Sequence, residues 1–480
     1  MPIALGSRKH VFVDWALIDP GYGVAWGGNV PTSWEMPYGV KITVHPPQID
    51  PTPLIVPERP WEEFINVYCT LLEIDGGFRL YYETHVRKED GDTDDLRAML
   101  AVAESRDGVT WEKPSLGILN FRGTTDNNLV YGLDAALGRG AHGATVFVDP
   151  SAPPEARYKL VHMGREDGRY RVFGATSPDG LRWTAMRKPL LDSYISDTQT
   201  VVRFDERRGR YIGYFRGWTH QPHAPGFHGR RAISYAETED FAHWPTPEII
   251  VAPEAADDPG TDIYTNSYTP WPGTGDAHLM FPAYYVRALD ILEVHLLSSR
   301  DGMRWERPLR APVIGAGEPG SGREGGVYAG CGLVAIRPGE WSLPIGPKRW
   351  THNQSLFPVG RATPDNGLLR RAVWRPDGMM SLEAVAEGRC STFPLVFAGS
   401  RLQVNVWARF AGEARFELAT ADGATIPGRS FAECDPVIGD SPQAIVTWNG
   451  DADVSPWSGQ AIRLRIWLRR ARLHALQFVE

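Results

Sequence analysis

The chain lacks several features that would each point to a particular class of protein. It has only four cysteines, which lie far apart and form no Cys-x-x-Cys pair, so nothing suggests a disulfide framework or a zinc site of the usual spacing. It has no run of five basic residues, and its formal net charge is −8. An acidic surface does not attract nucleic acid or an anionic membrane. We therefore expect neither as a partner.

Long apolar runs and helical periodicity are also missing. No apolar stretch reaches 18 residues, as a membrane-spanning helix would require. The N-terminal residues show none of the basic, apolar and cleavage segments of a signal peptide, so we expect a soluble, cytoplasmic protein. No 15-residue window keeps a clean period of 3.6, which predicts an all-β chain. We expect no cofactor and no metal, and the sequence leaves open whether the chain forms a homo-oligomer.

A short sequence recurs along the first two thirds of the chain. It reads Ser-x-Asp-Gly-x-x-Trp in three copies, at Ser105–Trp111, Ser177–Trp183 and Ser299–Trp305, with a degenerate copy at Thr238–Trp244. The four tryptophans are separated by 72, 61 and 61 residues. Asp-Gly between alternating apolar runs predicts a tight hairpin turn, because glycine accepts the positive φ that such a turn needs. A recurrence of about 60 residues indicates a radial or solenoid repeat.

Each recurrence contains four short alternating runs, and a fifth unit without the Trp turn follows at about residues 332–384. Four strands per unit in five units predict a five-bladed β-propeller over residues 61–387. The Pro-rich residues 1–60 are expected to form a lead-in that packs on the propeller. Residues 388–480 alternate strictly, with Asp-Gly and Asn-Gly at turns, which predicts a small antiparallel β-sandwich.

Acidic residues recur just before the predicted first strand of several units. In a propeller, that strand lines the central channel, and its first residues open onto one face. Asp197, Asp262 and Glu324 occupy such places in units three to five. Gathered carboxylates raise one another's pKa, and glycoside hydrolysis needs one protonated and one ionised carboxyl group. Each acid also has a structural interpretation, as a loop cap, an Asx-turn residue or an ion-pair partner.

Polar and aromatic residues accompany these acids at the same predicted rim. We expect this group to orient or stack a sugar, although His142 is equally compatible with a structural role; its members are His142, Arg216, Trp218, His220, Tyr264 and Asn266. The loop at 218–228 is rich in His and broken by Pro and Gly. Its spacing fits no standard metal-ligand set, which favours a substrate loop over a metal site.

Several segments together resemble a bacterial group of five-bladed propellers related to the glycosyl hydrolase family 32 and 43 superfamily. The resemblance covers most of the chain; the segments are Phe12–Ile18, Arg59–Glu62, Asp126–Asn128, Asp149–Tyr158, Gly260–Asn266 and Cys434–Asp440. It implies two carboxylic acids, one acting as nucleophile or base and one as general acid, with a third stabilising the transition state. It also implies substrates such as fructosides and arabinosides. The Asn-Asp-Pro nucleophile motif of family 32 is absent.

These observations predict a glycoside hydrolase that acts on a small glycoside or oligosaccharide, with a furanoside among the candidates. Asp262 is the expected base or nucleophile, Glu324 the expected general acid, and Asp197 the third acid. The alternative is a carbohydrate-binding propeller without catalysis.

Overall fold

The computed structural model describes residues 2–21, 36–87, 96–132, 140–167, 169–220, 229–354 and 367–480. The described residues form strands and two short 3-10 helices, at Pro154–Ala156 and Ser455–Trp457, so the predicted all-β class is confirmed. None of the described helices has the length and apolarity needed to cross a membrane. The chain divides into two compact units: Met1–Pro46, Trp271–Ala277 and Arg375–Glu480, and Pro47–Pro270 and His278–Trp374.

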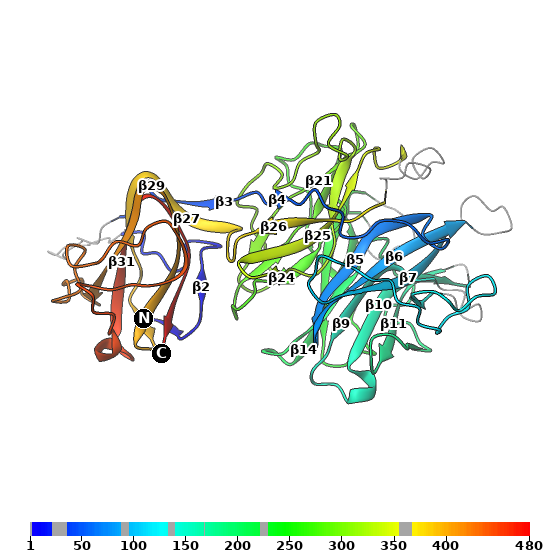
Figure 1. Cartoon of the computed structure of the whole chain (residues 1–480), viewed down its shortest axis with the longest axis horizontal. Coiled ribbons are helices and arrows are strands. Elements are labelled where there is room, and N and C mark those ends of the chain that lie inside the picture. The colour runs from blue at the N-terminus through cyan, green and yellow to red at the C-terminus, as the bar shows by residue number, and fades with distance from the viewer. Residues whose placement is uncertain are drawn as a thin grey trace. The chain divides into compact units, whose positions relative to one another are not determined.

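The larger unit is a propeller-like ring of antiparallel sheets (Figure 1), and its first three sheets have four strands each. The first sheet has the order β5 (Phe64–Ile74), β6 (Gly77–Arg87), β7 (Leu96–Ser105) and β8 (Leu129–Tyr131). The second is built from β9 (His142–Val148), β10 (Tyr158–Glu166), β11 (Arg169–Ser177) and β12 (Thr184–Ala185). The third contains β13 (Val201–Asp205), β14 (Arg210–Trp218), β15 (Arg231–Thr238) and β16 (Glu248–Val251).

The last two predicted units do not form two separate blades. An eight-stranded sheet joins β17 (Thr261–Ile263), β20 (Ala283–Val286), β21 (Ile291–Val294), β23 (Gly326–Ala329), β24 (Val334–Arg337), β25 (Glu340–Lys348), β26 (Arg370–Trp374) and β4 (Gln48–Ile49). The parallel pairing of β21 with β23 at Leu292 and Gly326 merges the units. A three-stranded sheet of β18 (Tyr268–Pro270), β19 (His278–Met280) and β22 (Leu297–Ser299) completes the described strands of this region. Within the described residues the ring therefore counts four blades, and the predicted five are not confirmed.

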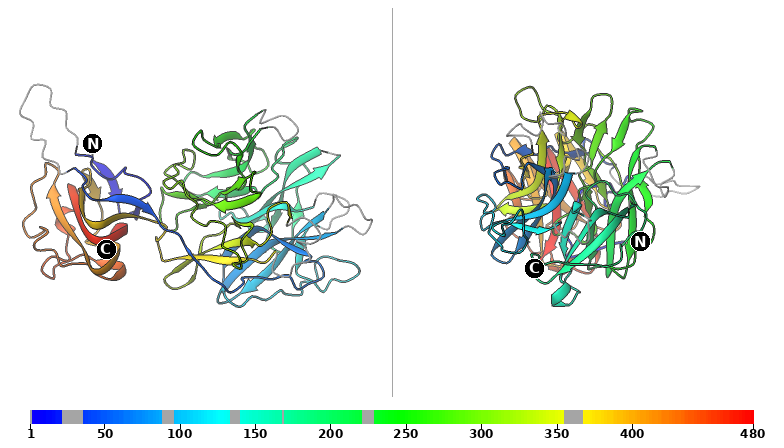
Figure 2. Two further views of the ribbon diagram at one scale, coloured as in Figure 1. Left: turned by 90° about the horizontal axis from the view of Figure 1, so that it is seen from above. Right: turned by 90° about the vertical axis from the view of Figure 1, so that its right-hand side faces the viewer.

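The first sheet meets the last one at a seam that closes the ring. Thr70 of β5 forms a parallel bridge with Cys331, the Leu71 amide donates to the Cys331 carbonyl, and the Cys331 amide donates to the Cys69 carbonyl. On the outer side, β4 pairs with β26. Figure 2 shows the colours of successive sheets, from blue to yellow, following one another through this unit. The chain thus closes the ring without a covalent link.

The repeated turn has the same hydrogen bonds in each copy. The Asp107 carboxylate accepts the amides of Val109 and Thr110 at 2.8 Å, and Asp179 and Asp301 accept the corresponding amides of their own turns. The following glycines have φ of +69° to +74°, the left-handed region that favours glycine. These acids are therefore engaged in building hairpins between outer strands.

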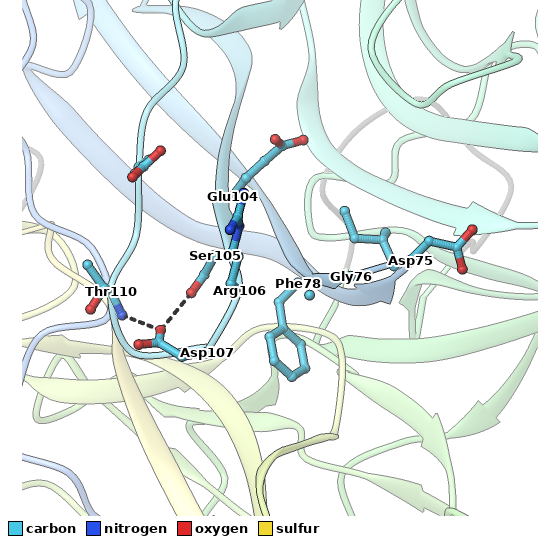
Figure 3. A pocket seen from close by; sticks show the side chains of 11 residues that line it. Asp75, Gly76, Phe78, Glu104, Ser105, Arg106, Asp107 and Thr110 are labelled. Carbon is cyan, nitrogen blue, oxygen red and sulfur yellow. Dashed lines mark hydrogen bonds between the residues drawn. The ribbon is translucent and has the colours of Figure 1, made fainter.

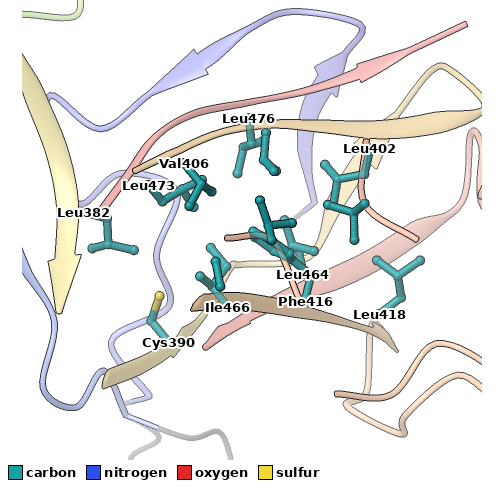
Figure 4. Close-up of a cluster of buried hydrophobic side chains, with 14 of the residues drawn as sticks. Leu382, Cys390, Leu402, Val406, Phe416, Leu418, Leu464, Ile466, Leu473 and Leu476 are labelled. Carbon is teal, nitrogen blue, oxygen red and sulfur yellow. The ribbon is translucent and has the colours of Figure 1, made fainter. Parts of the chain in front are cut away.

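The smaller unit is one continuous eight-stranded sheet. Its strands are β1 (Ile3–Gly6), β2 (His10–Val11), β3 (Lys41–Val44), β27 (Met380–Ser391), β28 (Leu395–Phe397), β29 (Arg401–Thr420), β30 (Asp440–Ile445) and β31 (Ala461–Val479). Figure 4 shows apolar side chains from β27, β29 and β31 gathered in one core, among them Leu382, Phe416 and Ile466. The predicted two-sheet sandwich is not confirmed. The predicted lead-in supplies β1 to β3 here and β4 to the ring.

Candidate functional site

A carboxylate, an imidazole and a second carboxylate form a chain of hydrogen bonds in the ring. Glu83 lies near the end of β6, His142 begins β9, and Asp197 precedes β13. His142 bonds to both acids, with Nδ1 at 3.0 Å from Glu83 Oε1 and Nε2 at 3.0 Å from Asp197 Oδ1. The Glu83 side chain is fully buried, whereas those of His142 and Asp197 are 25% and 31% exposed. The chain of contacts thus runs from the protein interior to solvent.

Glu83 is held by four donors. Its Oε1 accepts Asn66 Nδ2 at 3.2 Å as well as the rings of His85 and His142, and its Oε2 accepts the Gly143 amide at 2.6 Å. Burial acts to raise the pKa of Glu83, but the charges and hydrogen bonds of the two histidines outweigh it and lower the pKa. This carboxylate is therefore ionised and fixed in place.

His142 and Asp197 stabilise each other's charged forms. Burial acts to lower the pKa of His142, but Glu83 and Asp197 together raise it to about 10. Burial likewise acts to raise the pKa of Asp197, while His142, Arg216 and Arg231 lower it. Asp197 is consequently a partly exposed, ionised carboxylate with positive charge on more than one side.

Two arginines pack on one tyrosine ring beside Asp197. The guanidinium carbons of Arg216 and Arg231 lie 4.6 and 4.7 Å from the centre of the Tyr264 ring, and both arginines also lie over Trp218. Arg216 is almost fully buried and donates Nη2 to the Tyr264 carbonyl at 2.8 Å. Its Nε and Nη1 have no hydrogen-bond partner among the described residues. The site therefore has a cationic and aromatic wall with unused donors.

The structure places Asp262 behind this wall. Asp262 is fully buried and binds Arg231 at 2.7 Å and Arg287 at 2.8 Å, and it accepts the Arg231 amide at 2.9 Å. Burial acts to raise its pKa, and these hydrogen bonds and charges lower it. Both carboxylate oxygens are engaged, so Asp262 is placed to hold Arg231.

Glu324 stands two residues before β23. Its Oε1 accepts the Gly320 amide at 2.5 Å within its own loop, and its Oε2 has no hydrogen-bond partner among the described residues. Burial acts to raise its pKa, and backbone hydrogen bonds of the 320–324 loop and the Arg349 charge lower it. None of these contacts connects Glu324 to Asp197 or His142.

The remaining predicted residues differ in their surroundings. Asn266 is buried and uses its side chain on backbone groups, donating to the carbonyls of Gln199 and Tyr214 and accepting the Tyr268 amide. His220 is exposed, with Nδ1 at 3.3 Å from Thr219 Oγ1. Residues 221–228 of the His-rich loop lie outside the described residues. The structure thus brings together Asp197, His142, Arg216, Trp218 and Tyr264.

Sequence reasoning missed several members of this group. It ended one strand at Glu83, whereas β6 continues through Thr84 and His85. Residues two apart in a strand face the same side, so the Glu-x-His pair in an otherwise apolar strand was the available signal. Tyr68 lies within β5 and Tyr328 within β23, and neither was predicted as a site residue. The Tyr68 ring contacts the His142 ring edge-on at 5.4 Å.

A buried lysine adds to the charge near the site. Lys348, at the end of β25, is 3% exposed, and its Nζ lies 4.3 Å from the centre of the Phe64 ring. Phe64 in turn packs edge-on against His85 at 6.0 Å. Burial lowers the pKa of Lys348 to about 7. A neutral and a charged form of this amine therefore exist near neutral pH.

A surface pocket of about 670 Å³ lies elsewhere in the first sheet. Figure 3 shows it between the β5–β6 turn and the first repeated turn, lined by Asp75, Phe78, Glu104 and Asp107 among others. The Asp107 carboxylate is turned onto its own hairpin by the Ser105 and Thr110 hydrogen bonds. The pocket contains none of the predicted site residues.

No family model matches the chain. Two uncharacterized proteins of Mycobacterium tuberculosis are each 25% identical to it over 201 residues, which is 40% of this chain and 61% of theirs. The chain therefore spans less than two thirds of the length of these curated relatives.

The chain is also similar to solved structures of glycoside hydrolases. One, titled a glycoside hydrolase, has a TM-score of 0.48 and 14% identity and covers 69% of this chain and 93% of its own. A second comes from a study of the GH130 family of mannoside phosphorylases, which contains glycoside hydrolases that target β-1,2 mannosidic linkages in Candida mannan. It has a TM-score of 0.47 and 14% identity, and the match covers 77% of this chain and 97% of that chain. A family 43 arabinoxylan arabinofuranohydrolase from Bacillus subtilis has a TM-score of 0.39 and 12% identity, and the match covers 89% of this chain and 99% of that chain.

Proposed function

We propose that the chain hydrolyses a glycosidic bond in a small glycoside or oligosaccharide. The observation that carries the proposal is Asp197, an ionised carboxylate that is partly exposed beside the buried side chains of Arg216 and Tyr264. Glycoside hydrolysis requires an ionised carboxylate beside a cationic transition state. Three structural neighbours have names that include glycoside hydrolases or an arabinofuranohydrolase.

In this proposal Asp197 is the base or nucleophile, and Asp262 positions Arg231. Glu324 is the candidate proton donor, because its Oε2 has no hydrogen-bond partner among the described residues. Its pKa is lowered in the free protein, so the donor role requires that bound substrate remove water and raise the pKa.

The sugar would meet the cationic and aromatic wall. Arg216 is almost fully buried, so Arg231, whose side chain is 20% exposed, is the arginine of the wall that a sugar oxygen could reach. His220 and Trp218 stand at the start of the predicted substrate loop. Furanosides belong among the substrates to be tested because of the sequence resemblance.

The test is a screen of nitrophenyl pyranosides and furanosides with wild type and three variants. Asp197→Asn is expected to lower kcat by about 10²–10⁴-fold, the usual contribution of a positioned acid or base, and Glu324→Gln to lower it by a similar factor. Asp75→Asn, an exposed turn acid of the same ring, is the matched control and should keep wild-type turnover. Activity of Asp197→Asn within threefold of wild type would refute the assignment.

A carbohydrate-binding propeller without catalysis is the second candidate. It is favoured by the state of the acids, since Asp197, Asp262 and Glu324 all have lowered pKa values and none is protonated at neutral pH. Saturable sugar binding in calorimetry, with no turnover of any glycoside in the panel, would decide for this candidate.

A further inference from the structure

Three metal-ligating atoms converge on one point beside Asp197. The ligand atoms of Glu83, His85 and His142 all lie within 4.8 Å of one another. They come from two adjacent sheets, with Glu83 and His85 two residues apart on β6 and His142 at the first position of β9. The strand alternation that puts Glu83 and His85 on one face thus aims both at His142.

Hydrogen bonds from neighbouring residues orient these side chains, as such hydrogen bonds do around metal centres. His142 presents Nδ1 to the cluster, while its Nε2 bonds Asp197 at 3.0 Å. A carboxylate on the outer nitrogen fixes the tautomer and ring orientation of a metal-binding histidine. The Gly143 amide, at 2.6 Å, holds the Glu83 oxygen that does not face the histidines.

The three side chains are mostly buried, but solvent reaches one of them. Glu83 is fully buried and His85 nearly so, whereas the His142 side chain is 25% exposed. A buried carboxylate and imidazole favour a divalent cation, because water competes poorly for their lone pairs there. The exposed side of His142 gives the ion an entry path.

We propose that Glu83, His85 and His142 bind one divalent first-row transition metal ion, of which Zn²⁺ is the probe. Two imidazoles and one carboxylate suit zinc and its neighbours, and three protein ligands are typical of sites that keep a position open for water or substrate. Asp197 would act as the outer partner of His142. The proposal goes beyond the glycosidase function and departs from the expectation of no metal.

Metal content tests the proposal directly. The full chain is stripped with a chelator, incubated with Zn²⁺, desalted and assayed by elemental analysis, and its affinity is measured by competition with a chromophoric chelator. Wild type is expected to retain about one Zn²⁺ per chain. His85→Ala should bind more than 100-fold more weakly, and Asp197→Asn about 10–100-fold more weakly, as loss of an outer partner does.

His243→Ala is the matched control, because His243 is exposed and pairs with Asp240 of its own turn. It should keep wild-type affinity. His85→Gln and Glu83→Gln serve if His85→Ala fails to fold, and circular dichroism identifies that case.

Less than 0.2 Zn²⁺ per wild-type chain, or equal affinity in His85→Ala and wild type, would overturn the proposal. Its failure is distinct from that of the glycosidase: metal bound without glycoside turnover removes only the proposed function, and turnover by a chain that binds no metal removes only the metal site.

Discussion

At the scale of single residues, charges in the ring are set by burial and by specific partners. Glu83 and Asp262 are both fully buried acids that stay ionised, one through histidines and the other through arginines. Removing one partner from such a pair leaves an uncompensated buried charge, which costs about 3–5 kcal/mol. These acids therefore fix the orientation of the groups that face solvent.

Lys348 gives a pH prediction, because it is a buried cation without a carboxylate partner among the described residues. Its pKa is lowered from 10.5 to about 7 in the folded chain. Between these values the unfolded chain binds more protons, so folded stability rises with pH by up to about 1.4 kcal/mol per unit. The free energy of unfolding of wild type relative to Lys348→Met should therefore increase from pH 7 to 10 and be flat below pH 6.

Urea unfolding of both proteins at five pH values makes this comparison, and taking the difference cancels the other titrating groups. A difference that does not change between pH 7 and 10 would show that Lys348 is charged throughout.

The sequence analysis chose its candidate residues near the starts of the predicted inner strands and passed over residues deeper within strands. Asp197, His142 and Tyr264 were chosen in this way; in the structure Asp197 precedes β13, His142 begins β9 and Tyr264 follows β17. Glu83, His85 and Lys348 were not, because in a strand the same polar residue types usually face solvent. Which face is buried depends on the neighbouring sheet, and strand alternation alone does not reveal it.

At the scale of elements, the repeated turn both ends a strand pair and contacts a neighbouring sheet. A Cβ added at Gly180 would meet the Tyr81 hydroxyl of β6, and Arg79 donates Nη1 to the Asp179 carbonyl at 2.7 Å. Gly302 approaches Tyr214 of β14 in the same way, and the Tyr214 hydroxyl donates to its carbonyl at 2.8 Å. The turns therefore connect successive sheets.

This contact predicts unequal effects of two similar substitutions. Gly180 and Gly209 both have positive φ, +74° and +62°, but a Cβ at Gly209 would meet nothing within 4 Å. Gly209→Ala should cost only the backbone strain of about 1–2 kcal/mol. Gly180→Ala should cost about 1–3 kcal/mol more, from overpacking against Tyr81.

Chemical denaturation of the two variants measures both losses. Equal losses would mean that the second sheet shifts away from Tyr81 without strain.

The hairpins were predictable because Asp-Gly turn chemistry is local. The merging of the last two units was not, because it depends on the parallel pairing of β21 and β23, between residues more than 30 positions apart. Local alternation marks strands but does not choose their partners.

At the scale of the whole molecule, residues 48–50 close the ring from outside. Asp50 pairs with the buried Arg371 of β26, and its amide donates to the Arg371 carbonyl at 2.9 Å. Among the described residues, Asp50→Ala would leave the Arg371 side chain with one long hydrogen bond, 3.4 Å to Ser342 Oγ. We expect a loss of about 1.5–3 kcal/mol, the usual value for a hydrogen bond to a charged group.

Asp126→Ala, at an exposed acid of the same unit, is the reference and should change stability by less than about 0.5 kcal/mol. Thermal unfolding of the two variants and wild type would reveal the difference. If both variants melt like wild type, the ion pair contributes nothing to ring closure.

The all-β class and the ring could be predicted because a sequence repeat indicates structurally equivalent units. The predicted boundaries of 1–60, 61–387 and 388–480 remain a proposal. The division into compact units could not be predicted from the sequence. Trp271–Ala277 belongs to the same unit as the two ends of the chain, and no local sequence pattern shows that association.

The seam of the ring also carries two thiols, Cys69 and Cys331, both buried and with pKa values raised by burial. An alkylating reagent attacks the thiolate, and the raised pKa values disfavour the thiolate of both cysteines while the seam is closed. Their modification would then wait for the first and last sheets to part. The rate at which the two cysteines are alkylated would thus measure how often the ring opens.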